Sequence, residues 1–152
     1  MPIRILAIGK KHEAWVADGI ERYQKRLQRP LDTSWVFLPH SSREGLAARQ
    51  EESERILGRL DANEYVILLD ERGKLLDSPA LSRQLMEVLE RSQPVTLVIG
   101  GAYGVDETVH TRANLVWSLS PLVFPHQLVR LICTEQLYRA QEIARGNPYH
   151  HE

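Results

Sequence analysis

The chain has 152 residues, of which 43% are hydrophobic and 26% are charged, which is typical of a globular protein and excludes a disordered or membrane-embedded chain. Its 19 Lys and Arg residues nearly balance 20 Asp and Glu residues, so the formal net charge is −1. This balance excludes a general attraction to phosphate backbones, and any nucleic-acid binding must come from local patches or from a partner's surface.

The first pattern along the chain is a strand followed by a helix and a second strand. The apolar runs at 3–8 (IRILAI) and 34–38 (SWVFL) predict strands, and apolar residues at three-and-four spacing predict a helix over 12–29. One face of that helix is basic, and two lysines precede it. These basic residues are Lys10, Lys11, Arg22, Lys25, Arg26 and Arg29. Such a stripe is either a solvated helix face or a local phosphate-binding patch.

The next helix and strand follow the same alternation. A helix is predicted over 42–60, where Ser41 and Glu44 stand at capping-box spacing and Leu46 begins the apolar stripe. The run at 65–69 (YVILL) is almost unbroken in its apolar character. This pattern indicates a strand that is covered on both faces.

The second half of the chain continues the alternation. Ser78, followed by a proline, predicts a capped helix start, and 95–99 (VTLVI) predicts another strand covered on both faces. Asp106 predicts the start of a short helix, and 115–119 (LVWSL) predicts a fifth strand. Strands that alternate with helices favour an α/β fold, with a mostly parallel sheet and helices on both faces.

The last predicted helix, over 126–145, is strongly apolar. Its apolar face is wider than packing against one sheet requires, which favours a homodimer. Its single cysteine, Cys133, cannot form an intramolecular disulfide and is expected to be buried. Near this helix, Arg130, Arg139 and Arg145 form a second candidate basic patch together with the tail NPYHHE.

One domain is expected over residues 1–152, since this length suits a single core. The apolar run in the opening MPIRILAIGKK is short and wrongly flanked for a secretory signal, and no apolar stretch approaches the roughly 18 residues of a membrane span. Together with the single cysteine, this predicts a cytoplasmic protein.

Ligands of parallel sheets bind beyond the carboxyl ends of the strands, and three such ends have unusual chemistry here. They carry DERG after residue 69, GGAYG after residue 99, and an uncharged loop with two prolines over 119–125. An apolar loop beside a glycine turn suits a flat heteroaromatic such as adenine, which needs stacking area and hydrogen bonds at its edge. The alternatives are an ordinary glycine turn and a loop that fills the core or a subunit contact.

Other site types have no signature in the sequence. The six histidines show no paired metal-ligand spacing, so a metal is not expected. Dinucleotide-binding, P-loop and nucleophile-elbow motifs are missing as well.

Three segments in this order and at these distances resemble the RlmH (YbeA) family of ribosomal RNA methyltransferases in the SPOUT superfamily. They are LVIGGAYG, WSLSPLVFPHQLVRLICTEQLYRA and the terminal NPYHHE; the opening ILAIGK and the LLDERGK element extend the resemblance over the whole chain. The resemblance implies a single SPOUT domain with a C-terminal trefoil knot, acting as a homodimer. It also implies methyl transfer from S-adenosylmethionine to N3 of a pseudouridine in 23S ribosomal RNA, with the assembled ribosome as the substrate.

By position, the resemblance assigns the cofactor pocket to the end of the third strand, the glycine turn and the apolar loop. The residues implied to bind the cofactor are Leu69, Gly100, Leu119, Ser120, Pro121, Leu122, Val123 and Phe124. On this interpretation the loop is apolar because the nucleoside half of adenosylmethionine fills it.

Methyl transfer from a sulfonium needs no metal and no covalent enzyme intermediate, but it needs an in-line nucleophile that has lost its proton. His150, Glu135 and Arg139 are the candidates for assisting this loss, with Tyr149 as a stacking or orienting group. The sequence does not choose among them. The tail is expected to complete the partner subunit's site. His151 stands where members of the family commonly carry Lys or Arg, so a fixed positive charge there is in doubt.

Two other functions fit the same patterns. A non-catalytic, ribosome-associated module would keep the fold without turnover. A transfer RNA methyltransferase would share the cofactor pocket but would need a different recognition surface.

Overall fold

An all-parallel sheet of five strands forms the centre of the molecule in the computed structural model, which describes residues 2–151. The strands are β1 (Ile3–Ile8), β2 (Thr33–Leu38), β3 (Tyr65–Leu75), β4 (Val95–Ile99) and β5 (Leu115–Ser118), in the order β2-β1-β4-β3-β5. Every residue of the central strand β4 is buried. The prediction from its unbroken apolar run is thus confirmed, and so is the α/β class.

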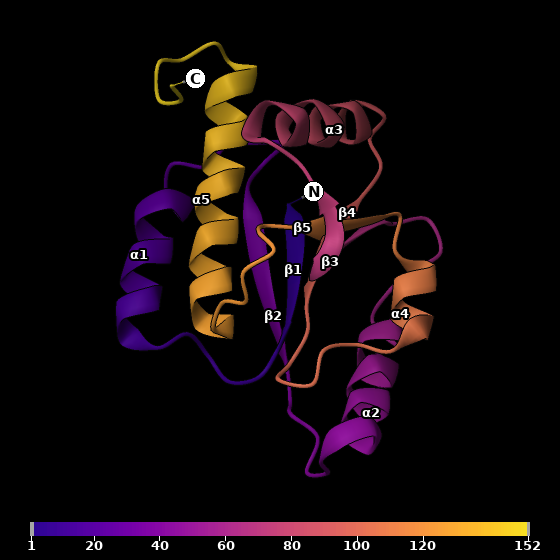
Figure 1. The fold of residues 1–152 in the computed structure, drawn as a ribbon. Coiled ribbons are helices and arrows are strands. Elements are labelled where there is room, and N and C mark those ends of the chain that lie inside the picture. The colour runs from indigo at the N-terminus through magenta and orange to yellow at the C-terminus, as the bar shows by residue number, and fades with distance from the viewer. Residues whose placement is uncertain (1, 152) are drawn as a thin grey trace.

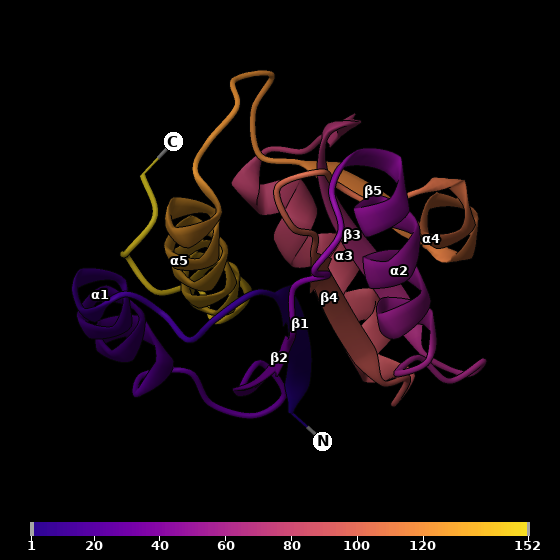
Figure 2. The ribbon, with the colours of Figure 1, turned by 90° about the horizontal axis from the view of Figure 1, so that it is seen from below.

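Five helices cover the two faces of the sheet. They are α1 (Ala14–Gln24), α2 (Gly45–Leu57), α3 (Ser78–Glu90), α4 (Glu107–Arg112) and α5 (His126–Ala144). Helices α1, α3 and α5 lie on one face, and α2 and α4 lie on the other (Figures 1 and 2). None of the helices among residues 2–151 has the length and apolar character that a membrane crossing requires.

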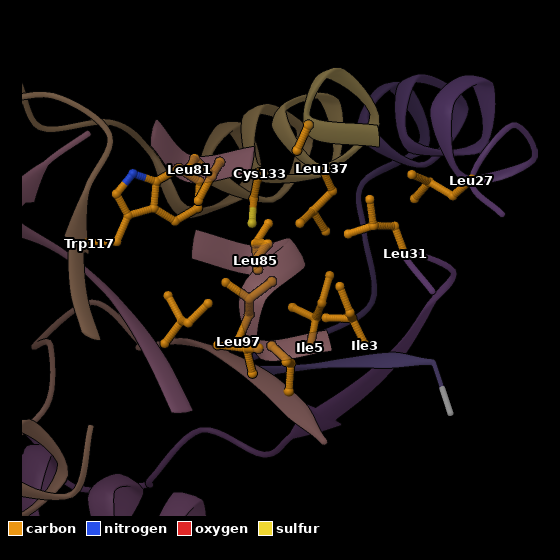
Figure 3. Close-up of a cluster of buried hydrophobic side chains, with 14 of the residues drawn as sticks. Ile3, Ile5, Leu27, Leu31, Leu81, Leu85, Leu97, Trp117, Cys133 and Leu137 are labelled. Carbon is orange, nitrogen blue, oxygen red and sulfur yellow. The ribbon is translucent and has the colours of Figure 1, made fainter. Parts of the chain in front are cut away.

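The larger core lies between the sheet and helices α3 and α5. Figure 3 shows Leu85, Cys133 and Leu137 above Ile5 and Leu97 of the sheet. Complete burial of an aliphatic side chain of this kind contributes about 1.5–3 kcal/mol. Cys133 is buried, as expected, and burial raises the pKa of its thiol to about 12.

Helix α1 is shorter than its apolar pattern predicts. It ends at Gln24 instead of residue 29. The residues after it form tighter turns, in which an N–H donates to the carbonyl three residues earlier, as Leu27 does to Gln24. Beyond it, the Gln28 N–H donates to Oε1 of Gln141 on α5, at 2.7 Å. A tertiary hydrogen bond therefore replaces the helical one, and sequence periodicity does not report such a bond.

Two predicted helix starts are wrong in detail. Ser41 and Glu44 form no capping box: the Ser41 N–H donates instead to Oε2 of Glu52, and Glu44 is the cap residue of α2 without a side-chain bond. Leu46, predicted in the apolar stripe of α2, is 73% exposed. Ser78 is the first residue of α3, because Asp77 caps the helix by accepting a hydrogen bond from the Ala80 N–H.

Strand β3 is longer than the predicted 65–69, and its extension shapes the site described below. Trp117 of β5 is paired with both Leu69 and Lys74, so the residues between them bulge out of the sheet. Gly73 closes this bulge, since a Cβ there would lie 2.6 Å from the Val116 carbonyl oxygen. The bulge carries polar side chains to the carboxyl edge of the sheet.

Candidate functional site

The main pocket, of about 440 Å³, lies at the carboxyl edge of strands β3, β4 and β5. Its volume is in the range of small-molecule sites. Seven of the eight residues implied to bind the cofactor line it, while Pro121 is exposed outside the lining. The seven are Leu69, Gly100, Leu119, Ser120, Leu122, Val123 and Phe124. The structure thus brings three distant segments to one cavity, and their role toward a cofactor stays a prediction.

The glycine turn after β4 forms the floor of the main pocket. The Gly104 N–H donates to the Gly101 carbonyl at 3.0 Å, and Gly104 has a φ of 71°, which closes the turn. A Cβ on Gly101 would lie 2.7 Å from Oε1 of the buried Glu52, whereas a Cβ on Gly100 would lie 3.2 Å from Cγ1 of Val105. A side chain at Gly101 would therefore displace the buried Glu52 carboxylate, whereas one at Gly100 would press on Val105, which lines the pocket.

The loop after β5 forms the apolar wall of the pocket. Two serine hydroxyls hold it: Ser118 donates to the Ser120 carbonyl, and Ser120 accepts from the Leu122 N–H, both at 3.0 Å. Within residues 2–151, the backbone N–H groups of Val123 and Phe124 have no hydrogen-bond partner. An apolar wall with free N–H groups fits the adenine ring of a nucleoside ligand. The residues present therefore suit the methyl donor that the sequence implies.

The bulge of β3 adds a charged rim; the sequence singled out DERG at this strand end, but assigned no role to its side chains. Oδ2 of Asp70 lies 3.0 Å from Nη2 of Arg72 and 3.1 Å from Nε2 of His110 on α4. Burial acts to raise the pKa of Asp70, but the hydrogen bonds and charge of Arg72, together with His110, hold it below its ordinary value. The carboxylate of Asp70 in this rim is therefore ionised, and the positive charge of Arg72 balances its negative charge. The available signal was the polar triplet directly after an apolar strand.

The four candidate catalytic residues meet on one side of α5. Oε2 of Glu135 accepts from Nη2 of Arg139 at 2.9 Å and from the Tyr149 hydroxyl at 2.7 Å. The guanidinium of Arg139 also lies over the Tyr149 ring, 4.7 Å from its centroid. We refer to Glu135, Arg139, Tyr149 and His150 as the tail cluster.

The hydrogen bonds of the tail cluster assign its protons. Nδ1 of His150 lies 3.0 Å from Nη1 of Arg139. Since a guanidinium only donates, Nδ1 accepts and the ring proton is on Nε2. Burial and the hydrogen bond to Glu135 raise the pKa of the Tyr149 hydroxyl above its ordinary value, so Tyr149 stays neutral and donates. Glu135 has accepted bonds on both oxygens, because Oε1 takes one from the Gln136 amide at 2.7 Å.

The apolar loop separates the main pocket from the tail. Leu119 and Phe124 line the main pocket and also a second pocket, which His150 and His151 line from the other side. Within one chain, the tail cluster and the main pocket therefore lie on opposite sides of the same loop. No side chain of the tail cluster lines the main pocket of the same chain.

The second candidate basic patch is partly wrong, because Arg130 is a core residue that is only 2% exposed. Its Nη1 donates to the Lys10 carbonyl at 2.8 Å, and its guanidinium lies 5.2 Å from the Phe37 ring centroid. Burial, together with the Arg130 charge, lowers the pKa of His12 to about 4. Arg130 thus ties α5 to the end of β1 and is not available to a partner. Among residues 2–151, no group of three or more His, Cys, Asp or Glu side chains could hold a metal ion.

The chain is similar to known proteins over its full length. A family profile described as "Predicted SPOUT methyltransferase" matches residues 1–150. The ribosomal RNA large subunit methyltransferase H of Hahella chejuensis is 38% identical, with 100% of both chains covered. The protein of the same name from a Psychrobacter species is 41% identical, over 99% of this chain and 98% of that one.

Among solved structures, a methylase family protein from Haemophilus influenzae aligns with a TM-score of 0.59 at 16% identity. The alignment covers 99% of this chain and 70% of that one. At this identity the similarity concerns the fold alone.

Proposed function

Since this chain belongs to the RlmH family of SPOUT methyltransferases, we propose that it methylates ribosomal RNA of the large subunit with S-adenosylmethionine as the methyl donor. The acceptor is N3 of a pseudouridine in 23S ribosomal RNA, within the assembled ribosome in the cytoplasm. The observation that carries this proposal is the main pocket, because seven of the eight residues implied to bind the donor line it. The names of the relatives support the ribosomal substrate.

The proposal includes the architecture that the family implies. The single domain would contain a C-terminal trefoil knot around the apolar loop, and two chains would form a homodimer. The loop before α5 supports a dimer, since Leu122 and Val123 are 68% and 78% exposed and large exposed apolar side chains favour a covering partner or ligand. The tail cluster of one subunit would then complete the main pocket of its partner.

In this proposal, Leu69, Gly100 and residues 119–124 would hold adenosylmethionine, which supplies an activated methyl group on a sulfonium centre. The chain's own part is to bind, orient and exclude water. The apolar wall and the free N–H groups of Val123 and Phe124 would orient the adenine ring, and Gly100 would allow the donor to approach the backbone.

The tail cluster would prepare the acceptor. An imide nitrogen must lose its proton before it attacks; the proton would pass to solvent water, and the resulting negative charge would be stabilised by a nearby cation and hydrogen-bond donors. Arg139 supplies the cation, and Nε2–H of His150 supplies a donor whose direction is fixed by the bond at Nδ1. Glu135 positions Arg139 and Tyr149 instead of taking the proton, since its oxygens already accept bonds from these and from Gln136.

The experiment incubates purified protein with unmethylated bacterial ribosomes and isotopically labelled adenosylmethionine, and maps the modified nucleotide by mass spectrometry. The proposal expects label on one pseudouridine of 23S ribosomal RNA. Ribosome binding without any labelled RNA would support the non-catalytic module. Label on transfer RNA added to the same reaction, with none on the ribosome, would support a transfer RNA methyltransferase.

A further inference from the structure

A surface at the end of α1 has positive charge that the fold does not use. Arg22, Lys25, Arg26 and Arg29 are exposed, and within residues 2–151 none of them takes part in an ion pair. We call these four residues the α1 basic surface. Because the whole chain carries a net charge of −1, four unpaired cations within eight positions are a local excess and not a reflection of the composition.

The α1 basic surface is fixed in place against α5. Nε2 of Gln141 donates to the Arg26 carbonyl at 3.0 Å, and Oε1 of Gln141 accepts from the Gln28 N–H at 2.7 Å. Gln141 is 3% exposed, so both bonds are shielded from water. Figures 1 and 2 both place α1 beside α5. A clamped backbone fixes where these side chains start, so binding needs to order only the side chains and not the backbone.

Aromatic contacts connect this surface to the tail cluster. The rings of Tyr23 and Tyr138 have centroids 5.9 Å apart, and those of Tyr138 and Tyr149 are 4.8 Å apart. Tyr23 is the neighbour of Arg22 in the chain, and Tyr149 belongs to the tail cluster. The tyrosine rings thus connect the end of α1 with the tail cluster.

We propose that the α1 basic surface binds the phosphate backbone of the RNA that presents the acceptor base. This inference rests on the proposed function and adds its RNA-docking surface. Charge complementarity favours RNA, because Arg and Lys side chains beside tyrosines offer both phosphate contacts and faces on which bases stack. An acidic protein surface would match the cations but would leave the tyrosine faces without a role.

The test measures the dissociation constant of the labelled full-length protein for purified bacterial ribosomes as a function of KCl. The variant is Arg22→Gln/Arg26→Gln, which keeps the backbone bond of Arg26 to Gln141 because only side chains change. The matched control is Arg59→Gln/Arg91→Gln, which removes the same charge from two exposed residues outside the α1 basic surface. Adenosylmethionine binding by each protein reports whether the fold is intact.

Loss of two phosphate contacts lowers the slope of log K against log salt by about 1.4–1.8. Between about 50 and 200 mM KCl, the loss of affinity should therefore be about tenfold smaller for the variant than for wild type. The control should keep the wild-type slope. Equal slopes for variant and control would overturn the inference.

Methylation measured on the same proteins separates the two proposals. If the wild type methylates and the Arg22→Gln/Arg26→Gln variant has an unchanged KM and slope, the docking surface is wrong and the proposed function stands. If the wild type binds RNA through this surface but does not transfer a methyl group, the docking surface stands and the proposed function is wrong.

Discussion

Gly100→Val is expected to abolish adenosylmethionine binding. A Cβ on Gly100 would lie 3.2 Å from Cγ1 of Val105 and 3.4 Å from the Gly104 carbonyl carbon, so the first carbon requires only a small shift of its neighbours. The two further methyl groups of valine would add bulk beside Val105 and Gly104, which both line the main pocket. They would occupy the space through which the donor approaches the backbone.

The magnitude follows from the affinity expected of the site. Micromolar binding corresponds to about −8 kcal/mol, and binding too weak to detect at about 1 mM corresponds to a loss of at least about 4 kcal/mol. Isothermal titration calorimetry of the purified protein with adenosylmethionine measures both values. Gly100→Ala should lie between the two, because its single methyl group leaves most of the pocket open.

The neighbouring glycine provides the matched control. A Cβ on Gly101 would lie 2.7 Å from Oε1 of Glu52 and 3.0 Å from Cγ2 of Ile8, and Glu52 is only 3% exposed. Gly101→Ala should therefore act on stability, at about 1–3 kcal/mol for overpacking, or a fall of about 2–12 °C in Tm. Gly100→Val should leave Tm within a few degrees of wild type. An unchanged dissociation constant for Gly100→Val would refute the assignment of the pocket.

Two further substitutions test the tail cluster and the half-buried His12. Glu135→Gln removes the charged acceptor that holds Arg139 and Tyr149. In steady-state kinetics kcat should fall about 100-fold, because the acceptor site is misplaced, while calorimetry should show a change of less than about threefold in the adenosylmethionine dissociation constant. A parallel change in both constants would contradict this prediction. In the folded chain the pKa of His12 is lowered from 6.5 to about 4. Between these two pH values the unfolded chain binds a proton at His12 and the folded chain does not, so the free energy of unfolding decreases as pH falls through this range. His12→Gln should therefore show a smaller decrease in Tm between pH 7 and pH 5 than wild type, and an equal decrease would show that other groups cause it.

The sheet was predictable because strands that are buried on both faces are apolar along their whole length. The nearly unbroken apolar run of β4 reflects a strand with neighbours on both sides and helices on both faces. The bulge in β3 has no comparable sequence pattern, since it depends on where Trp117 of the adjacent strand is paired. The only local sign is Gly73, whose missing side chain makes room for the Val116 carbonyl.

The tail cluster was likewise only partly predictable from the sequence. Glu135 and Arg139 are four residues apart on a helix, so their ion pair follows from helical spacing. Tyr149 joins them only because Gly146, at a φ of 71°, ends α5 and the Asn147 N–H donates back to the Glu142 carbonyl. The sequence contains the glycine that permits this reversal, but the direction of the returning chain is set by contacts with α5.

The apolar character of the loop between β5 and α5 is explained by binding better than by folding. Leu122 and Val123 remain 68% and 78% exposed, so folding of one chain draws little stabilisation from them. Full burial of such a side chain is worth about 1.5–3 kcal/mol, and covering both would supply a sizeable part of the roughly 8 kcal/mol of a micromolar complex. Under the proposed function, the methyl donor on one side of the loop and a second chain on the other would cover this apolar surface, so polar substitutions in the loop should weaken binding without stabilising the fold.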